Sequence, residues 1–343
     1  MFKNLLHQEL NHCLIIKIKM NLYPLKFTPL SKYRIWGGNK LNTLLNKGFQ
    51  ADNIGESWEI SDEKGGKTKV CNGGLRGYSL QQLAAEYKDA FVGKNVYDSF
   101  GTDFPLLIKF IDAKTPLSIQ VHPNDAVAKE RHESFGKNEM WYVMQGDENA
   151  ELIVGFDKAL NKKSYQEYLD SNKILDVMHH ETVQKGDTFY IPAGRVHAIG
   201  AGVLLAEIQQ TSDVTYRIYD YERVDKQTGK TRELHNDLAL DIIDFEVHEN
   251  YKTDYSKEKN YSNTLVHAPY FTSNYLSIEG ALEKDYSGID SFIIYICISG
   301  SLTLIENEIS YSLVQGETML IPASIHKINL HAASNAEILE VYY

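Results

Sequence analysis

Residues 183–197 read VQKGDTFYIPAGRVH, and residues 313–326 repeat this pattern as LVQGETMLIPASIH. A glycine, an acidic residue, a threonine, Ile-Pro-Ala and a histidine recur in the same order. There is one residue fewer between Pro322 and His326 than between Pro192 and His197. Glycine turns followed by short β-branched and aromatic runs are typical of antiparallel strands. The repeat therefore predicts two related β-barrels in one chain.

The rest of the sequence predicts a mainly β fold. Short apolar stretches rich in Val, Ile, Tyr and Phe are separated by turn residues, and they span residues 104–111, 117–121, 140–144, 151–156, 188–191, 203–208 and 292–298. A few stretches have helical apolar spacing or a helix-capping residue at their start. They predict short helices outside the barrels at residues 79–87, 124–134, 164–178 and 233–240.

The composition is that of a globular protein and limits the possible partners. The chain has 343 residues, 43% of them hydrophobic, and a formal net charge of −11. An acidic chain without a Lys/Arg tract is not expected to bind nucleic acid or an anionic membrane. No apolar run approaches the roughly eighteen residues of a spanning helix. Cys13, Cys71 and Cys297 lie far apart without a CxxC motif, which favours a reducing, cytoplasmic environment.

The ends of the predicted domains follow from local composition. Residues 1–19 carry an apolar run broken by lysines and lack the order of a signal peptide. We interpret them as a non-conforming N-terminal extension, with Met20 as the start of the protein proper. The polar segment 250–263 is the expected linker. These boundaries give a catalytic domain at 20–250 and a degenerate second domain at 251–343.

Four residues have the types and spacing of a metal site. Gln120 and His122 flank Val121, so in a strand they point to one face. Glu139 and His197 would join them inside the first barrel. Two imidazoles and one carboxylate suit Zn²⁺ or another first-row ion. The Gln120 amide either coordinates the ion or hydrogen-bonds to its ligands. The second repeat keeps only His326, so we expect the second barrel to be structural.

The spacing of Glu139 to Gly146, and of Gly186 to His197, resembles the two motifs of the cupin superfamily, so the fold expected is two cupin-like antiparallel β-barrels (jelly rolls). Four segments are more specific: GESWE (55–59), PLSIQVHP (116–123), NEMWY (138–142) and YRIYD (216–220). They resemble the type I mannose-6-phosphate isomerase family in its compact bacterial form. Gln120-x-His122 stands where cupins usually have His-x-His.

The resemblance implies an aldose–ketose isomerase that interconverts mannose 6-phosphate and fructose 6-phosphate through a cis-enediol. It implies that the metal is zinc, held by Gln120, His122, Glu139 and His197. It also implies that Arg217 is catalytic, and that Ser118 and Lys137 contact the phosphate or hydroxyl groups of the substrate. The oligomeric state is not implied.

The residues themselves leave several roles open. Lys109 is a charge in an apolar strand, so it either reaches the site or pairs with a buried carboxylate. Arg217 either acts on the substrate or pairs with Asp213 or Asp220. Because an arginine stays protonated, the proton carrier is either Glu207 or a metal-bound water. Lys109 and Glu207 are thus further candidates for substrate binding.

Two other functions share the same ligand set. An Fe²⁺ cupin oxygenase would use a His/Glu site without groups for a phosphate. A non-catalytic sugar-binding cupin would need neither the full ligand set nor Arg217. The presence of both in this sequence favours the isomerase.

Overall fold

The computed structural model describes residues 20–343, and the predicted extension at residues 1–19 lies outside this part of the chain. The helices are α1 (Lys40–Thr43), α2 (Leu80–Tyr87), α3 (Asp89–Val92), α4 (Lys94–Phe100), α5 (Asp125–His132), α6 (Lys162–Asp170) and α7 (Asn236–Ile242), with a 3-10 turn at Ile174–Val177. No helix in residues 20–343 is long and apolar enough to cross a lipid bilayer.

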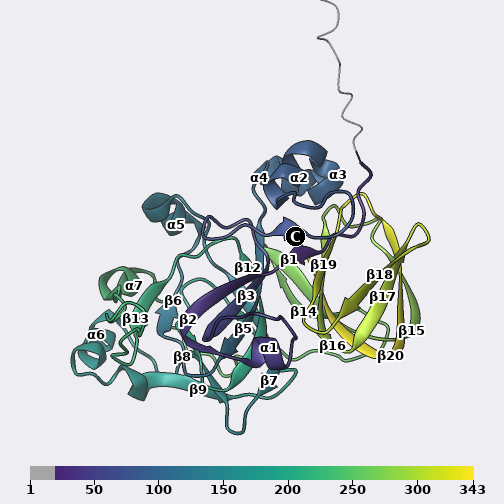
Figure 1. Cartoon of the computed structure of the whole chain (residues 1–343). Helices are drawn as coiled ribbons and strands as arrows, with labels where there is room; N and C mark the ends of the chain where they lie inside the picture. Colours follow the sequence, from purple (N-terminus) through teal and green to yellow (C-terminus); the bar gives the residue numbers. More distant parts are fainter. Residues whose placement is uncertain (1–19) are drawn as a thin grey trace, which may run out of the picture.

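Most of the chain is β structure, as the sequence predicts (Figure 1). The strands before the linker are β1 (Phe27–Thr28), β2 (Leu30–Gly38), β3 (Ile54–Ile60), β4 (Lys69–Val70), β5 (Leu106–Ala113), β6 (Ile119–Val121), β7 (Glu139–Gly146), β8 (Glu151–Phe156), β9 (Met178–Thr182), β10 (Thr188–Ile191), β11 (His197–Ile199), β12 (Val203–Gln210) and β13 (Tyr216–Tyr219). Those after it are β14 (Asn263–Ala268), β15 (Phe271–Asp285), β16 (Ile293–Ser299), β17 (Ser301–Glu306), β18 (Ile309–Val314), β19 (Thr318–Ile321) and β20 (Lys327–Tyr342).

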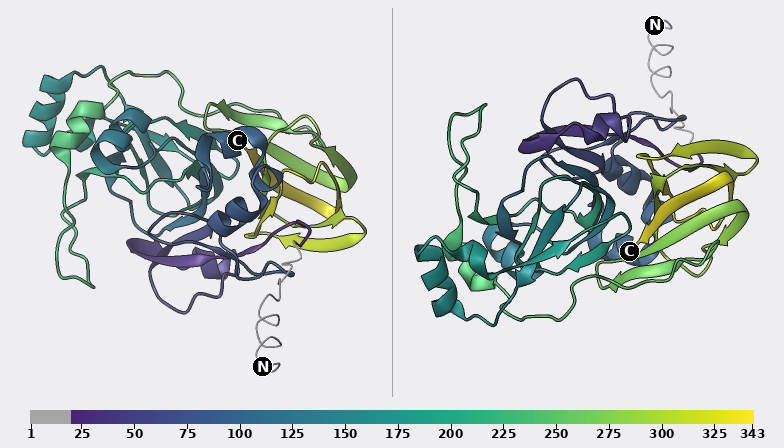
Figure 2. Two further views of the ribbon diagram at one scale, coloured as in Figure 1. Left: turned by 90° about the horizontal axis from the view of Figure 1, so that it is seen from above. Right: turned by 90° about the horizontal axis from the view of Figure 1, so that it is seen from below.

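Three antiparallel sheets make up the body of the molecule. One six-stranded sheet has the order β10-β7-β12-β5-β2-β3, and a five-stranded sheet has the order β13-β6-β11-β8-β9. The C-terminal sheet runs β14-β15-β20-β16-β19, with β17 and β18 added through β20. In Figure 2 this C-terminal sheet lies at one end of the molecule, and helices α6 and α7 lie at the other.

Strand alternation explains why β5 and β12 are buried along their whole length. On β12, Val203 and Leu205 pack in the cluster between the six-stranded and the five-stranded sheet, whereas Leu204 and Ala206 pack in the cluster shared with the C-terminal sheet. Because side chains alternate, Glu207 shares the inner face with Val203 and Leu205. Its register partner on β5 is Lys109, so two charges face the interior.

The internal repeat is a structural repeat. β10 pairs with β7, and β19 pairs with β16 in the same way. Opposite Ile191 stands Glu139, but opposite the equivalent Ile321 stands Ile293. In the C-terminal sheet, the position equivalent to Glu139 is therefore filled by an apolar side chain. The core of this sheet around Tyr295 and Ile338 is fully buried. His326 is exposed at its surface.

The predicted helices form, but the one predicted at 233–240 begins only at Asn236, and the one predicted at 164–178 is shorter than expected. Ser79 caps α2 with a capping box, and Asn124 caps α5. The helix expected at 164–178 ends at Asp170. Asn172 has a positive φ of 56°, which terminates the helix, and from Met178 the chain pairs with β8 as strand β9. The prediction of one continuous α-helix to residue 178 was therefore wrong: residues 174–177 form only a 3-10 turn, whose buried Ile174 and Val177 lead into the strand.

The α2–α4 group covers the junction between the sheets of residues 27–219 and the C-terminal sheet (Figure 1). Ala323 N donates to the Phe91 carbonyl at 3.0 Å, and the rings of Phe104 and Phe292 pack at a tilt of 37° with their centroids 4.5 Å apart. One apolar cluster accordingly contains residues from both parts of the chain.

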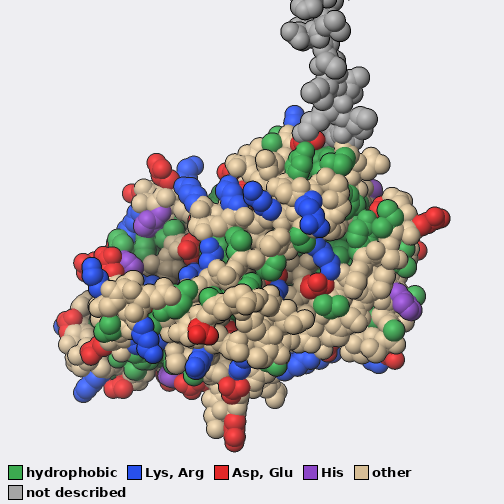
Figure 3. All heavy atoms as spheres, in the orientation of Figure 1, with side chains coloured by type: hydrophobic (Ala, Val, Ile, Leu, Met, Phe, Trp, Pro, Cys, Tyr) green, Lys and Arg blue, Asp and Glu red, His purple; other side chains and the backbone are tan. Residues whose placement is uncertain are grey.

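On the face in Figure 3, acidic and basic side chains are interspersed rather than grouped by sign.

Candidate metal centre and active-site cavity

Three neighbouring strands bring the candidate ligands together. Gln120 on β6 is the register partner of His197 on β11 and, on its other side, of Arg217 on β13. His122 follows β6 directly, and Glu139 begins β7 in the facing sheet. The short strands β6 and β11 thus bring together two imidazoles that are 75 residues apart in the sequence.

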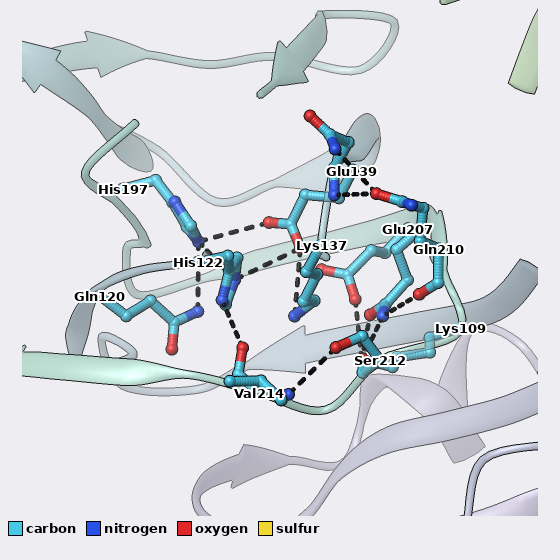
Figure 4. A network of polar contacts seen from close by, with 12 residues as sticks. Lys109, Gln120, His122, Lys137, Glu139, His197, Glu207, Gln210, Ser212 and Val214 are labelled. Carbon is cyan, nitrogen blue, oxygen red and sulfur yellow. Dashed lines mark hydrogen bonds and ion pairs between the residues drawn. The ribbon is translucent and has the colours of Figure 1, made fainter. Parts of the chain in front are cut away.

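The donor atoms of the three residues converge (Figure 4). The Nε2 atoms of His122 and His197 are 3.1 Å apart. Glu139 Oε2 lies 3.5 Å from His122 Nε2, and Glu139 Oε1 lies 3.3 Å from His197 Nε2. All three side chains are buried, with at most 1% of each exposed.

The hydrogen bonds of the two imidazoles leave their Nε2 atoms free to bind a cation. His122 Nδ1 bonds to the Val214 carbonyl at 3.0 Å, and His197 Nδ1 bonds to the Arg195 carbonyl at 2.9 Å. A carbonyl can only accept, so each Nδ1 carries a proton and each neutral ring turns an Nε2 lone pair towards the other. Neither oxygen of Glu139 has a well-formed hydrogen bond, and the only ammonium near them in residues 20–343 is that of Lys137, 3.1 Å from Oε2. A shared cation would satisfy all these acceptors at once.

Burial keeps both imidazoles neutral, as metal ligands must be. Burial, helped by the charge of Lys137 and opposed by the hydrogen bond to the Arg195 carbonyl, lowers the pKa of His197 to about 4. The pKa of His122 is lowered for the same two reasons, burial first. Burial raises the pKa of Glu139, and this is opposed by Lys137, whose Nζ is 3.1 Å from Oε2. A cation between these groups would favour the ionised carboxylate.

The Gln120 side chain lies beside the same group. Its Nε2 is 3.4 Å from His197 Nε2. Rotation of the amide by 180° would place Oε1, a possible ligand atom, in that position. Both alternatives for Gln120, a ligand or a hydrogen-bonding neighbour, are therefore compatible with its position.

A cavity of about 400 Å³ lies next to this centre. Six of the predicted site residues line it, namely Lys109, Ser118, Gln120, Lys137, Glu207 and Arg217. The three convergent ligands lie behind two of them, since Gln120 contacts His197 and Lys137 contacts Glu139. All the predicted site residues are thus gathered at one place.

Lys109 both reaches the cavity and pairs with a buried carboxylate. Its Nζ lies 2.9 Å from Glu207 Oε1 and 2.5 Å from Gln209 Oε1. The second oxygen of Glu207 accepts from Trp141 Nε1 at 3.0 Å. Burial opposes ionisation of Glu207, but Lys109 and then Lys137 outweigh it, so its pKa is lowered. Glu207 is thus a stable carboxylate with both oxygens occupied.

Arg217 does not pair with either of the carboxylates suggested by the sequence. No carboxylate of residues 20–343 lies within ion-pair distance of it, and Asp220 instead binds Arg223 and Arg232. Its Nε donates to Ser118 Oγ at 3.3 Å, and its NH1 donates to the Glu233 carbonyl at 2.8 Å. The remaining guanidinium nitrogen is therefore available to the cavity.

Several charged wall residues have no signal in the sequence. Arg34 binds Glu56 through two bonds of 2.8 and 2.9 Å, and this lowers the pKa of Glu56 to about 2 against the effect of burial. Asp213 and Arg232 also line the cavity. The segment around Glu56 is part of the family resemblance, but its partner Arg34 is on another strand and only the fold brings them together.

Other hollows and clusters lack this convergence. An open groove of about 1360 Å³ runs along α5 towards Tyr343 and shares Asp213 with the smaller cavity. It is larger, but the convergent metal donors are at the smaller one. A second group, Asp244, Glu246 and His248, is at least partly exposed, and Arg195 occupies His248 Nε2 at 2.7 Å.

A mainly β fold of this topology with a buried His₂Glu centre beside a charged cavity defines a metal-binding cupin enzyme. Residues 25–167 match the family model of the phosphomannose isomerase type I catalytic domain. Residues 261–342 match the model of the mannose-6-phosphate isomerase cupin domain. The chain belongs to the type I mannose-6-phosphate isomerase family.

Relatives match over nearly the whole chain. A probable mannose-6-phosphate isomerase of Bacillus subtilis is 34% identical over 88% of this chain and 94% of its own. The mannose-6-phosphate isomerase of Streptococcus mutans is 33% identical over 85% of this chain and 90% of its own. The crystal structure of a Bacillus subtilis mannose 6-phosphate isomerase superposes with a TM-score of 0.85, at 31% identity, covering 94% of this chain and all of that one.

Proposed function

We propose that this enzyme interconverts mannose 6-phosphate and fructose 6-phosphate at the cavity beside His122, Glu139 and His197. The observation that supports it most is one juxtaposition. Three buried side chains that could hold a cation lie next to a cationic side chain, Arg217, that forms no ion pair with any carboxylate of residues 20–343. An aldose–ketose isomerisation through a cis-enediol develops negative charge on two neighbouring oxygens, and fixed positive charges stabilise it.

Zinc is the cation proposed for the centre. Two neutral imidazoles and one carboxylate are a common donor set for Zn²⁺, and Gln120 is proposed as the fourth protein group. Bound there, the ion would supply positive charge next to the sugar oxygens. The two backbone carbonyls that bond to the Nδ1 atoms keep the imidazole rings oriented for it.

Arg217 is proposed to bind the substrate oxygens on which charge develops. Its planar guanidinium can donate to two oxygens at once. Ser118 accepts from its Nε and the Glu233 carbonyl from NH1, so the group is held in place before substrate arrives. Lys137, on the same wall, is proposed to bind a hydroxyl or phosphate oxygen.

Proton transfer between C1 and C2 is assigned to Asp213 rather than Glu207. Both oxygens of Glu207 are occupied by Lys109 and Trp141, and its pKa is lowered. Asp213 lines the cavity, is exposed, and forms no ion pair within residues 20–343. A free carboxylate can accept and return a proton. Lys109 and Glu207 then act as a fixed pair beneath the substrate.

Residues 20–250 are proposed as the catalytic unit and residues 251–343 as a structural second unit. The cytoplasm is the proposed location, in which the half-buried Cys71 and the buried Cys297 remain free thiols. The proposed partner is a small sugar phosphate.

A direct test combines the reaction with removal of one ligand. The parent protein should convert mannose 6-phosphate to fructose 6-phosphate with oxygen excluded. An oxygenase needs O₂ as a co-substrate and would not turn over under this condition. Glu139→Gln removes the carboxylate and should lose metal and activity together. His326→Gln is the matched control in the second sheet and should retain both. An inactive parent that holds one metal per chain would reject the proposed reaction.

A further inference from the structure

Both backbone polar groups of Arg217 are bound by a single residue, His235. β13 is the edge strand of its sheet, with β6 on one side only. The backbone N–H of Arg217 donates to His235 Nδ1 at 3.1 Å, and its carbonyl accepts from the backbone N of His235 at 2.7 Å. His235 therefore takes the place of a partner strand at the free edge of β13.

The use of the His235 ring for this contact departs from a local rule. His235 is the N-cap of α7, a position usually filled by Ser, Thr, Asp or Asn, whose side chains bond to the first turn. His235 makes no side-chain cap hydrogen bond. Its ring points instead to the neighbouring strand. His235 thus bonds to the backbone of Arg217 and does not cap α7. Such departures from local sequence preference tend to occur at functional sites.

The segment just before α7 also holds the end of the Arg217 side chain. The carbonyl of Glu233, two residues before His235, accepts from Arg217 NH1 at 2.8 Å. The segment 233–235 thus binds Arg217 at its backbone N–H, its backbone carbonyl and its guanidinium. A shift of this segment would move the guanidinium relative to the metal centre.

We propose that His235, in its neutral form with the proton on Nε2, is the positioning residue that holds Arg217 in its catalytic orientation. This inference rests on the proposed role of Arg217. A backbone N–H can only donate, so Nδ1 must be the unprotonated nitrogen. A proton on Nδ1 would place two donors against each other and release the N–H of Arg217.

The surroundings of His235 define the expected pH dependence. Burial lowers its pKa, Arg217 on β13 and His132 on α5 lower it further, and Glu233 in the adjoining turn raises it. The ring of Tyr216 lies 6.4 Å away. His235 therefore stays neutral at pH values below the ordinary pKa of histidine, which is about 6.5. The rate should fall only when the pH drops through this lowered value.

The test compares two substitutions of His235 with a control. His235→Leu has similar bulk but no acceptor, whereas His235→Asn offers an oxygen near the position of Nδ1 and does not titrate. His267→Leu, an exposed histidine bonded to Thr272 in the C-terminal sheet, is the control. All are assayed as holoenzymes for kcat, KM, metal content and melting temperature.

His235→Leu should lower kcat about 10- to 100-fold, because small misplacements of a catalytic group cost this much. Its metal content should equal that of the parent, and KM should stay within about 3-fold. His235→Asn should recover kcat to within about 3-fold and lack the acid limb assigned to His235. Parent-like kcat in His235→Leu, or equal losses in both variants, would overturn the proposal.

A measurement without substrate separates this inference from the proposed function. The Arg217 amide should exchange with deuterium at least 10-fold faster in His235→Leu than in the parent, and hardly faster in His235→Asn. Unchanged exchange in His235→Leu would reject the contact itself. If exchange behaves as expected but the parent does not isomerise mannose 6-phosphate, the proposed function fails and the positioning contact stands.

Discussion

Removal of the positive charge at Lys109 should destabilise the catalytic part of the chain strongly. Lys109 and Glu207 are both at most 4% exposed, and their charged atoms are 2.9 Å apart. Lys109→Met would leave Glu207 as a buried carboxylate bonded only to Trp141. The loss of one partner of a buried pair typically costs about 3–5 kcal/mol, because the other charge is left uncompensated.

The effect should depend on pH with a defined sign. In the parent, Lys109 helps to lower the pKa of Glu207, so its carboxylate adds stability above the unfolded value of about 4.3. In Lys109→Met, burial without the lysine raises this pKa, and stability falls as pH rises through the unfolded value. The deficit against the parent should therefore be larger at pH 7 than at pH 5.

Urea unfolding followed by tryptophan fluorescence measures this deficit. The three tryptophans, Trp36, Trp58 and Trp141, all precede the linker, so the signal reports on the catalytic part. Parent and variants are compared after treatment with chelator, so that metal binding does not contribute. Lys109→Met/Glu207→Gln is the control, since its glutamine can still accept from Trp141, and it should recover at least half of the loss. A single variant within about 1 kcal/mol of the parent would refute the reasoning.

Three further substitutions test the site. His197→Ala should lower metal content and activity together, because one of three strong ligands is removed; elemental analysis and the isomerase assay check this, and full activity with metal retained would reject the ligand assignment. Arg217→Lys should keep metal and lower kcat about 10²–10³-fold with little change in KM, as for a lost donor to a developing charge; a rise in KM alone would make Arg217 a ground-state binder. His326→Ala should leave kcat within a few-fold of the parent, because this side chain is exposed and the position equivalent to Glu139 is occupied by Ile293; a large loss in a folded variant would assign the C-terminal sheet a part in the site.

The fold and the convergence of the ligands could be predicted because they depend on short-range patterns. The alternation of side chains places Gln120 and His122 on one face, and the repeated motif positions β10 against β7. The register of that pair then brings Glu139 to the end of a strand beside His197. These relations need only strand periodicity and turn chemistry, both of which are written in local sequence.

Other features depend on contacts between distant segments, which no local pattern encodes. The bidentate pair of Arg34 and Glu56 forms across two strands. The contact of His235 with Arg217 joins a helix start to an edge strand. His179 and His180 lie in strand β9, whose conformation is determined by its pairing with β8. In each case tertiary pairing outweighs the local signal.

The most direct test of the central claim is a metal titration of the catalysed reaction. Metal-stripped protein is supplied with increasing Zn²⁺, and conversion of mannose 6-phosphate to fructose 6-phosphate is followed with oxygen excluded. Because the proposed centre is a single group of three buried candidate ligands, His122, Glu139 and His197, the rate should rise linearly and level off near one equivalent of Zn²⁺ per chain. Full activity in the metal-stripped protein, or no activity with Zn²⁺, Fe²⁺ or Mn²⁺, would contradict the account.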